Sequence, residues 1–263
     1  MTDFRFTRRG LLVGAASSGT LLLAGCDKLT GDAKLRRVLG LAEPFNNKVH
    51  GFIEGRHKLA REYGSDQLST DFRANGTTMP GGDDYAEAVA SNFVDWRLAV
   101  DGLVHSPLNL SLDQIRRMPA RTQITRHDCV EGWSAIGGWT GVQLGHLLQA
   151  AGLKANARYA VFHCADNLEG ESEKGGIQSP GQYYESIDLI DAFHPQTILA
   201  YAMNGAALPI AHGAPLRLRV ERQLGYKHAK YVQRIEIVES LAGIGSGMGG
   251  YWEDRGYAWY AGI

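Results

Sequence analysis

The chain has 263 residues, with 27 Lys and Arg against 28 Asp and Glu, so its formal net charge is −1 with histidine neutral. This balance gives no electrostatic reason to expect nucleic acid as a partner. Hydrophobic residues make up 44% of the chain and charged residues 21%, which is typical of a folded globular protein and excludes disordered, collagenous and multi-span membrane proteins.

Residues 1–26 resemble an export signal. The pair Arg8 and Arg9 precedes an apolar run from Leu11 to Leu23, which is typical of twin-arginine signals. The run ends at Cys26 after small residues, as in the lipobox of bacterial lipoproteins. A membrane-anchoring helix is the alternative, but the run is shorter than the roughly 20 residues that span a bilayer. We therefore expect a periplasmic protein that Cys26 could anchor through a lipid.

The mature chain is expected to have two parts. Residues 27–92 read as a polar tether and an N-terminal excursion, in which residues 65–84 are polar and rich in glycine. Residues 93–263 read as the ordered domain. Alternation of apolar and polar residues predicts strands at 96–100 and 216–220, and further strands are predicted at 123–126, at the apolar run 159–162 and at 232–237.

Helix and turn signals separate these strands. Capping boxes predict one helix from Ser111 to about Arg117 and a second from Thr140 to Gly152. A third short helix is predicted over 186–193, and Asn204-Gly205 predicts a hairpin between 197–203 and 206–209. Because these elements do not alternate as βαβ units and no G-x-G-x-x-G follows a strand, we predict an α+β fold with mixed sheets and short helices.

Two cysteines, Cys129 and Cys164, remain in the mature chain. Outside the cytoplasm, a disulfide between them is one interpretation. The sequence has no C-x-x-C-H for haem attachment and no clustered cysteines for an iron–sulfur centre. A redox centre would therefore depend on a single thiolate.

The residues with the most potential for chemistry lie in one segment, Arg126-His127-Asp128-Cys129-Val130-Glu131-Gly132-Trp133, which is followed by Gly138-Trp139-Thr140-Gly141. It resembles the cysteine loop of the sulfite oxidase family of molybdenum-pterin enzymes, in the short bacterial branch that includes the periplasmic methionine sulfoxide reductase catalytic subunits. The resemblance implies that the Cys129 thiolate ligates molybdenum, and a thiolate is the soft donor that such a metal accepts.

A second block runs from His212-Gly213-Ala214-Pro215-Leu216-Arg217 to Gly225-Tyr226-Lys227-His228-Ala229-Lys230. It resembles the family's strand and the segment that grips the pterin phosphate. The resemblance extends over 93–238 and implies a molybdopterin-binding catalytic domain at 93–263. It implies cofactor contacts from His212, Arg217, Gly225, Tyr226, Lys227 and Lys230, with Lys227 supplying a positive charge. A solvated basic edge is the alternative for the lysines, and a surface ion pair for the arginine.

Further site residues follow from the same resemblance or from nearness in sequence. Asn46 lies in a patch that resembles an upstream pterin contact, and Cys164 stands where the family has a threonine. His212 replaces an asparagine of the reductases, so the pocket could serve another molecule. Candidates for steering substrate or protons are His127, Trp133, Asp166 and Tyr184, for which packing or solvent exposure is the alternative.

The sequence therefore predicts an exported molybdenum-pterin oxidoreductase. It would perform two-electron oxo transfer on a small S-oxide, N-oxide or sulfite-like substrate, with molybdenum-molybdopterin as cofactor. Since the chain carries no other redox motif, we expect a separate electron-transfer protein such as a membrane haem protein or cytochrome. We also expect a monomer, because no dimerisation domain fits after residue 238. The alternative is an exported zinc- or copper-binding lipoprotein that uses His127, Cys129, His163 and Cys164.

Overall fold

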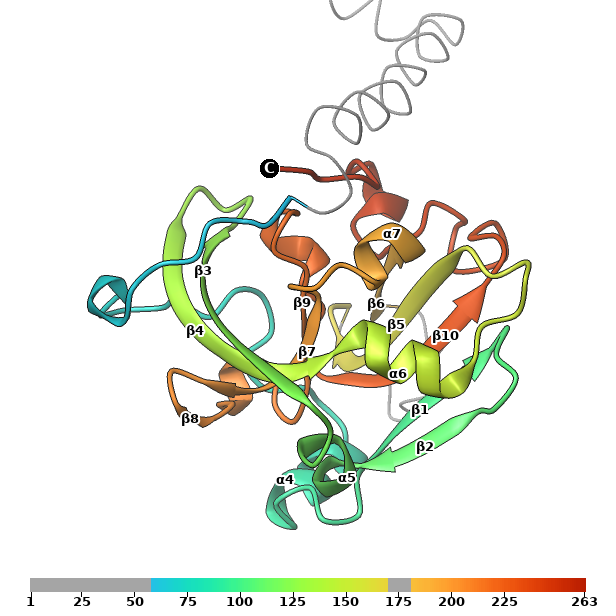
Figure 1. The fold of residues 1–263 in the computed structure, drawn as a ribbon, viewed down its shortest axis with the longest axis horizontal. Helices are drawn as coiled ribbons and strands as arrows, with labels where there is room; N and C mark the ends of the chain where they lie inside the picture. The colour runs from blue at the N-terminus through green and yellow to red at the C-terminus, as the bar shows by residue number, and fades with distance from the viewer. Residues whose placement is uncertain (1–57, 170–180) are drawn as a thin grey trace, which may run out of the picture. The chain divides into compact units, whose positions relative to one another are not determined.

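Two five-stranded sheets carry the fold (Figure 1). The computed structural model describes residues 58–169 and 181–263, which belong to one unit spanning 54–263. Strand order is β2-β1-β10-β5-β6 in the first sheet and β3-β4-β7-β8 in the second, where β9 also pairs with β7. The expectations for Arg8, Arg9, Cys26 and Asn46 lie outside the described residues.

The first sheet is mixed. β1 and β10 are parallel, and the other neighbouring pairs are antiparallel. Its strands are β1 (Arg97–Gly102), β2 (Leu108–Ser111), β5 (Tyr159–Asn167), β6 (Gln182–Asp188) and β10 (Val232–Val238).

The second sheet is antiparallel throughout. Its strands are β3 (Ala120–Asp128), β4 (Ser134–Gln143), β7 (Ile198–Met203), β8 (Ala206–Ala207) and β9 (Arg217–Arg219). β3 and β4 remain paired up to Asp128 and Ser134, so the turn that contains Cys129 closes the end of this long hairpin.

The helices of residues 58–169 and 181–263 are short and few. The α-helices are α4 (Asp83–Ala90), α5 (Leu112–Arg116), α6 (Leu144–Ala151) and α7 (Leu189–Ala192). The 3₁₀ helices are η1 (Ser65–Gln67), η2 (Ile210–His212), η3 (Gly225–Lys227) and η4 (Glu253–Arg255). None of the helices in the described ranges is long and apolar enough to cross a bilayer. The α+β class predicted from the sequence is confirmed.

Local sequence signals explain several of these boundaries. The Ser111 side chain accepts from the N–H of Gln114 while the Gln114 side chain accepts from the N–H of Ser111, which confirms the predicted capping box of α5. The hairpin β7–β8 turns at Asn204-Gly205, where both residues adopt positive φ, as a type I′ turn requires. α6 buries Leu144, Leu147 and Leu148 completely, so its packing agrees with the predicted apolar face.

The predicted helix start at Thr140 is wrong. Residues 140–143 continue β4, and α6 begins only at Leu144. The Thr140 hydroxyl lies 2.9 Å from that of Thr122 across the strand pair, so it does not cap a helix. At Gly141 a Cβ would lie 2.1 Å from the carbonyl oxygen of Leu199, so the glycine is needed for close approach of β7 at a register shift.

The helix predicted over 186–193 exists but starts later than expected. β6 extends to Asp188, and the helical part is only Leu189–Ala192. Asp188 is the N-cap, because its side chain accepts from the N–H of Asp191 over 2.8 Å. Ser186 is kept in the strand by a long-range contact, since its hydroxyl donates to the carbonyl of Gly249.

Candidate functional site

Cys129 lies in a tight turn between β3 and β4. Its N–H donates to the carbonyl of Trp133 over 2.9 Å, and its own carbonyl accepts from the N–H of Gly132 over 3.0 Å. Gly132 has a φ of +86°, which favours glycine at this position. Burial raises the pKa of the Cys129 thiol, and a hydrogen bond with the backbone of Glu131 opposes this rise only in part. The protein alone therefore disfavours the thiolate, which a bound metal ion would stabilise.

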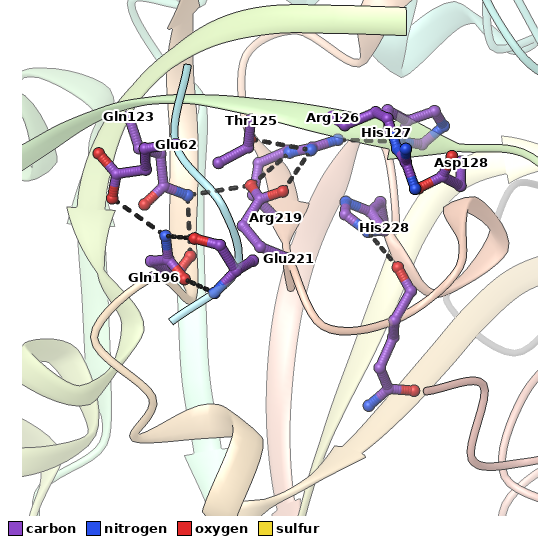
Figure 2. Close-up of polar contacts among 12 residues, drawn as sticks. Glu62, Gln123, Thr125, Arg126, His127, Asp128, Gln196, Arg219, Glu221 and His228 are labelled. Atoms are coloured by element: carbon purple, nitrogen blue, oxygen red, sulfur yellow. Dashed lines mark hydrogen bonds and ion pairs between the residues drawn. The ribbon is translucent and has the colours of Figure 1, made fainter. Parts of the chain in front are cut away.

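His127, two residues before this turn, is buried against Arg219 (Figure 2). Arg219 Nη1 lies 2.9 Å from His127 Nδ1. Because a guanidinium has no acceptor, Nδ1 accepts this bond and the hydrogen of the neutral ring is on Nε2. Burial, and then the charge of Arg219, hold the pKa of His127 well below its usual range. Nε2 is buried and has no hydrogen-bond partner in the described part of the chain.

Two arginines of β9 have contrasting environments. Arg219 forms a bidentate ion pair with Glu221, at 2.9 Å from Nε to Oε1 and 2.6 Å from Nη2 to Oε2. Arg217 is fully buried but donates only to backbone carbonyls, of His212 at 3.0 Å and His228 at 3.4 Å. Within residues 58–169 and 181–263, Arg217 Nε has no partner. Burial, and then Arg219, lower the pKa of Arg217 to about 9.

Lys230 is a second buried cation. Its Nζ donates to the carbonyls of Asn75 at 2.7 Å, Ala211 at 2.9 Å and Thr77. Burial, and then the charge of Arg217, lower the pKa of Lys230 to about 7. Like Arg217, it makes no ion pair with a carboxylate of the described residues.

The unpaired cations and the histidines beside them form a basic cradle. We use this name for His127, His212, Arg217, His228 and Lys230. Burial, and then neighbouring positive charge, lower the pKa of His212 to about 4 and that of His228 well below its usual range. Buried cations that form no ion pair are costly, so the cradle is suited to an anionic ligand.

Glycines allow the chain to close around the cradle. Gly213 has a φ of +109°, and a Cβ there would lie 2.9 Å from Lys230 Cβ and 3.1 Å from Arg217 Cβ. At Gly225 a Cβ would lie 2.6 Å from His127 Nε2. The predicted site residue Gly225 therefore packs directly against the histidine that precedes the Cys129 turn.

Residues 72–77 also reach the site, and sequence reasoning missed them. The Phe72 ring centroid lies 5.7 Å from those of His127 and His212 and 6.0 Å from that of Trp133. Asn75 Oδ1 is buried with no partner among the residues described. These residues belong to the stretch interpreted as a surface excursion, where the aromatic Phe72 was the available signal. The division into 27–92 and 93–263 stays a prediction.

The side chain of Lys227 does not face the cradle. It is buried between Glu185 and Glu253, with which it forms ion pairs. This corrects the expectation that its ammonium grips a phosphate, because two carboxylates already neutralise it. Tyr226 is tied through its hydroxyl to the carbonyl of Ala258 over 2.6 Å. Cofactor contacts from the backbone of Gly225, Tyr226 and Lys227 stay predictions.

The remaining candidates divide between the site and its surroundings. The Trp133 ring centroid lies 5.4 Å from that of His127, so Trp133 belongs to the site. Asp166 is buried near Lys230, and burial raises its pKa to about 7. Cys164 is buried, and its interactions with Asp166 and Lys230 put it beside the cradle. Tyr184 instead donates to Asp254 over 2.6 Å in the C-terminal segment, and nothing places it at Cys129.

Neither the disulfide nor the zinc or copper interpretation fits. Cys129 and Cys164 are both free thiols. His163 and Cys164 are consecutive on β5, so their side chains point to opposite faces, and His163 Nε2 lies 2.9 Å from Glu236 Oε2. The described residues contain no group of three or more His, Cys, Asp or Glu side chains arranged to hold a metal ion. The interpretation of these residues as a zinc or copper site was therefore wrong.

Comparisons with known proteins identify the family. The oxidoreductase molybdopterin binding domain matches residues 86–242, which is more than half of the chain. The chain belongs to this family. It is a molybdopterin-dependent oxidoreductase, and its cofactor is molybdenum-molybdopterin. The sulfite oxidase-like relationship that the two sequence blocks predicted is thereby confirmed.

Named relatives agree with this assignment. A putative protein-methionine-sulfoxide reductase subunit YedZ1 of Azospira oryzae is 37% identical over 98% of this chain and 86% of its own length. The catalytic subunit MsrP of Gluconobacter oxydans is 38% identical over 55% of this chain and 47% of its own length. Separately, the crystal structure of the sulfane dehydrogenase SoxCD from Paracoccus pantotrophus matches 56% of this chain and 39% of its own chain, with a TM-score of 0.48 and 25% identity, and the assignment does not rest on it.

The described residues fit the cofactor. A pterin phosphate would supply the anion that Arg217 and Lys230 lack, and the buried, unpartnered Nε2 of His127 could donate to it or to another polar group of the cofactor. Cys129, in its fixed turn, would provide the soft thiolate ligand for molybdenum. When bound, this cofactor supplies two-electron oxo-transfer chemistry.

Proposed function

We propose that the chain is an exported methionine sulfoxide reductase. The observation that carries the proposal is the similarity to the YedZ1 relative over 98% of the chain, together with a Cys129 turn and a basic cradle that suit the cofactor. In the reaction, a sulfoxide takes up two electrons and two protons, its S–O bond breaks, and a thioether and water are released.

The surroundings of Cys129 support a sulfur-containing substrate. Phe72 and Trp133 present aromatic rings on the side of His127, and sulfur atoms make favourable contacts with aromatic rings. Val130, beside Cys129, has 46% of its surface exposed, so an apolar side chain borders the turn. Trp133 is oriented by a hydrogen bond of 2.9 Å from Nε1 to Glu131 Oε2. These groups would receive the methyl thioether end of a methionine side chain.

The electrons would come from a separate protein. The relatives from Azospira oryzae and Gluconobacter oxydans are both named as subunits of a reductase, which supports a second component. We propose a membrane haem protein or a cytochrome as this component. Export through Arg8 and Arg9, with an optional lipid anchor on Cys26, would place both proteins at the periplasmic face of the membrane.

A substrate screen with a reduced dye as electron donor tests this function. We expect turnover of methionine sulfoxide, both free and within a peptide, and none with NADH or NADPH as donor. A protein that oxidises sulfite or reduces N-oxides but not methionine sulfoxide would contradict the substrate. Export is tested separately, by replacing Arg8 and Arg9 with Lys and measuring how much protein reaches the periplasm.

A further inference from the structure

A buried trio of charged side chains lies beside the cofactor site. Lys227 Nζ is 2.5 Å from Glu185 Oε1 and 2.6 Å from Glu253 Oε1. The exposed fractions of the three side chains are 0% for Lys227, 0% for Glu185 and 1% for Glu253. They come from three separate elements, η3, β6 and η4, so the trio joins distant parts of the chain.

The charges of the trio do not balance if both carboxyl groups are ionised. One ammonium cannot neutralise two buried carboxylates, and burying an unpaired carboxylate is costly. Tyr183, Tyr184 and Cys164 also interact with Glu185, and none of them adds positive charge. Burial, against the opposing effect of Lys227, raises the pKa of Glu185 well above its usual range, and Glu253 raises it further.

The second oxygens of the two carboxyl groups support the same conclusion. Glu185 Oε2 and Glu253 Oε2 are both buried, and neither has a partner in the part of the chain that the structure describes. A proton placed on one carboxyl group would let it donate a hydrogen bond to the other, as in other carboxyl pairs that share a proton. It would also bring the net charge of the trio to zero.

The trio fixes the position of η3. Tyr183 of β6 donates to the carbonyl of Tyr226 over 2.5 Å, and the Tyr226 hydroxyl donates to Ala258 over 2.6 Å. β6 therefore holds η3 on one side and the C-terminal segment holds it on the other. The contacts involve both the side chains and the backbone of η3. Its first residue, Gly225, packs against His127, so a displacement of η3 would reach the residue that precedes the Cys129 turn.

We propose that Glu185 and Glu253 share one proton while they jointly neutralise Lys227, and that the two carboxyl groups together hold η3 against His127. Glu253 touches neither Cys129 nor the cradle and acts through Lys227. The inference concerns the cofactor site and does not depend on which substrate the enzyme reduces.

Infrared spectroscopy of the full chain tests the shared proton. We expect a carbonyl stretching band of a protonated carboxyl group that persists at about pH 9, where an ordinary carboxyl group and Asp166 are ionised. The band should disappear in Glu185→Gln and in Glu253→Gln, and stay in the matched control Glu239→Gln, which replaces an exposed glutamate. Absence of the band from the wild-type protein, or its survival in both variants, would overturn the shared proton.

Charge-balanced variants test the positioning role. Each single Gln variant keeps one carboxylate for Lys227, so its molybdenum content should stay within about twofold of wild type. The double variant Glu185→Gln/Glu253→Gln leaves the ammonium buried without a counter-charge, and its molybdenum content should fall about tenfold or more, with a lower Tm. Adding Lys227→Met should restore both quantities. A double variant that matches wild type, or a triple variant no better than the double, would overturn the role.

Both measurements also separate this inference from the proposed function. The infrared band and the Tm need no substrate, so they report on the trio even if methionine sulfoxide is not reduced. Conversely, turnover of methionine sulfoxide by the wild-type enzyme without the band would leave the proposed function standing and remove the shared proton.

Discussion

Arg219 donates a hydrogen bond to Nδ1 of His127 over 2.9 Å, and this contact fixes the hydrogen of the neutral imidazole on Nε2. Arg219 is in turn held by Glu221, whose Oε1 also accepts from Gln123 Nε2 over 2.9 Å (Figure 2). A chain of buried polar contacts therefore orients His127 next to the Cys129 turn. The imidazole ring of His127 is therefore neutral and can donate a hydrogen bond from Nε2. It is neither a cation nor a base at this place.

Acid should destabilise the cofactor-free chain through its buried histidines. An unfolded histidine binds a proton below about pH 6.5, whereas the folded pKa values of His127 and His228 lie well below that. The unfolded state then holds more protons, so the free energy of unfolding falls as the pH drops below about 6.5, by up to about 1.4 kcal/mol per pH unit for each histidine. Denaturant unfolding between pH 5 and 8 measures this slope.

Replacing one histidine should flatten the slope. His228→Asn should lower the number of protons taken up on unfolding by about one. The control His105→Asn, which replaces an exposed histidine, should leave the slope unchanged. Equal slopes in the His228 variant and the wild type would show that His228 is protonated in the folded state.

The two arginines of β9 should respond oppositely to the same substitution. Arg217→Met removes a buried charge that has no carboxylate partner, so the cofactor-free chain should be as stable as wild type or more stable while molybdenum per chain falls. Arg219→Met leaves Glu221 without its ion pair, which should lower stability by about 3–5 kcal/mol. Unfolding free energies and molybdenum analysis give both readings, and a large destabilisation by Arg217→Met would contradict the account of the cradle.

Gly225 should not tolerate a methyl group. In Gly225→Ala the new Cβ would lie 2.6 Å from His127 Nε2, and the resulting overpacking should cost about 1–3 kcal/mol and reduce molybdenum content. Gly243→Ala is the matched control, because a Cβ at Gly243 would meet nothing within 4 Å. If the two variants unfold at the same denaturant concentration, η3 does not press against His127.

Much of the fold could be predicted because its signals are local. The α5 capping box depends on Ser111 and Gln114 alone, and the β7–β8 hairpin on Asn204-Gly205. Thr140 shows where this fails, because its hydroxyl pairs with Thr122 across a strand and Gly141 is required by β7. Such contacts join residues far apart in sequence, and no local pattern reveals them.

The site was predictable where a motif carries the chemistry. The segments around Cys129 and Arg217 identified the family, and the comparisons confirm it. The role of Lys227 was not predictable, since its partners Glu185 and Glu253 lie 42 and 26 residues away and belong to no motif. Phe72 was missed for a related reason, because its polar surroundings in sequence concealed its packing on His127.

Molybdenum X-ray absorption on the purified enzyme measures directly whether Cys129 ligates the metal of the cofactor. We expect Cys129→Ser to lower the sulfur scattering around molybdenum and to abolish turnover. Cys164→Ser, which replaces the other free thiol of the described residues, should leave the molybdenum spectrum as in wild type. An unchanged sulfur shell in Cys129→Ser, or a wild-type enzyme that contains zinc or copper in place of molybdenum, would contradict this ligation.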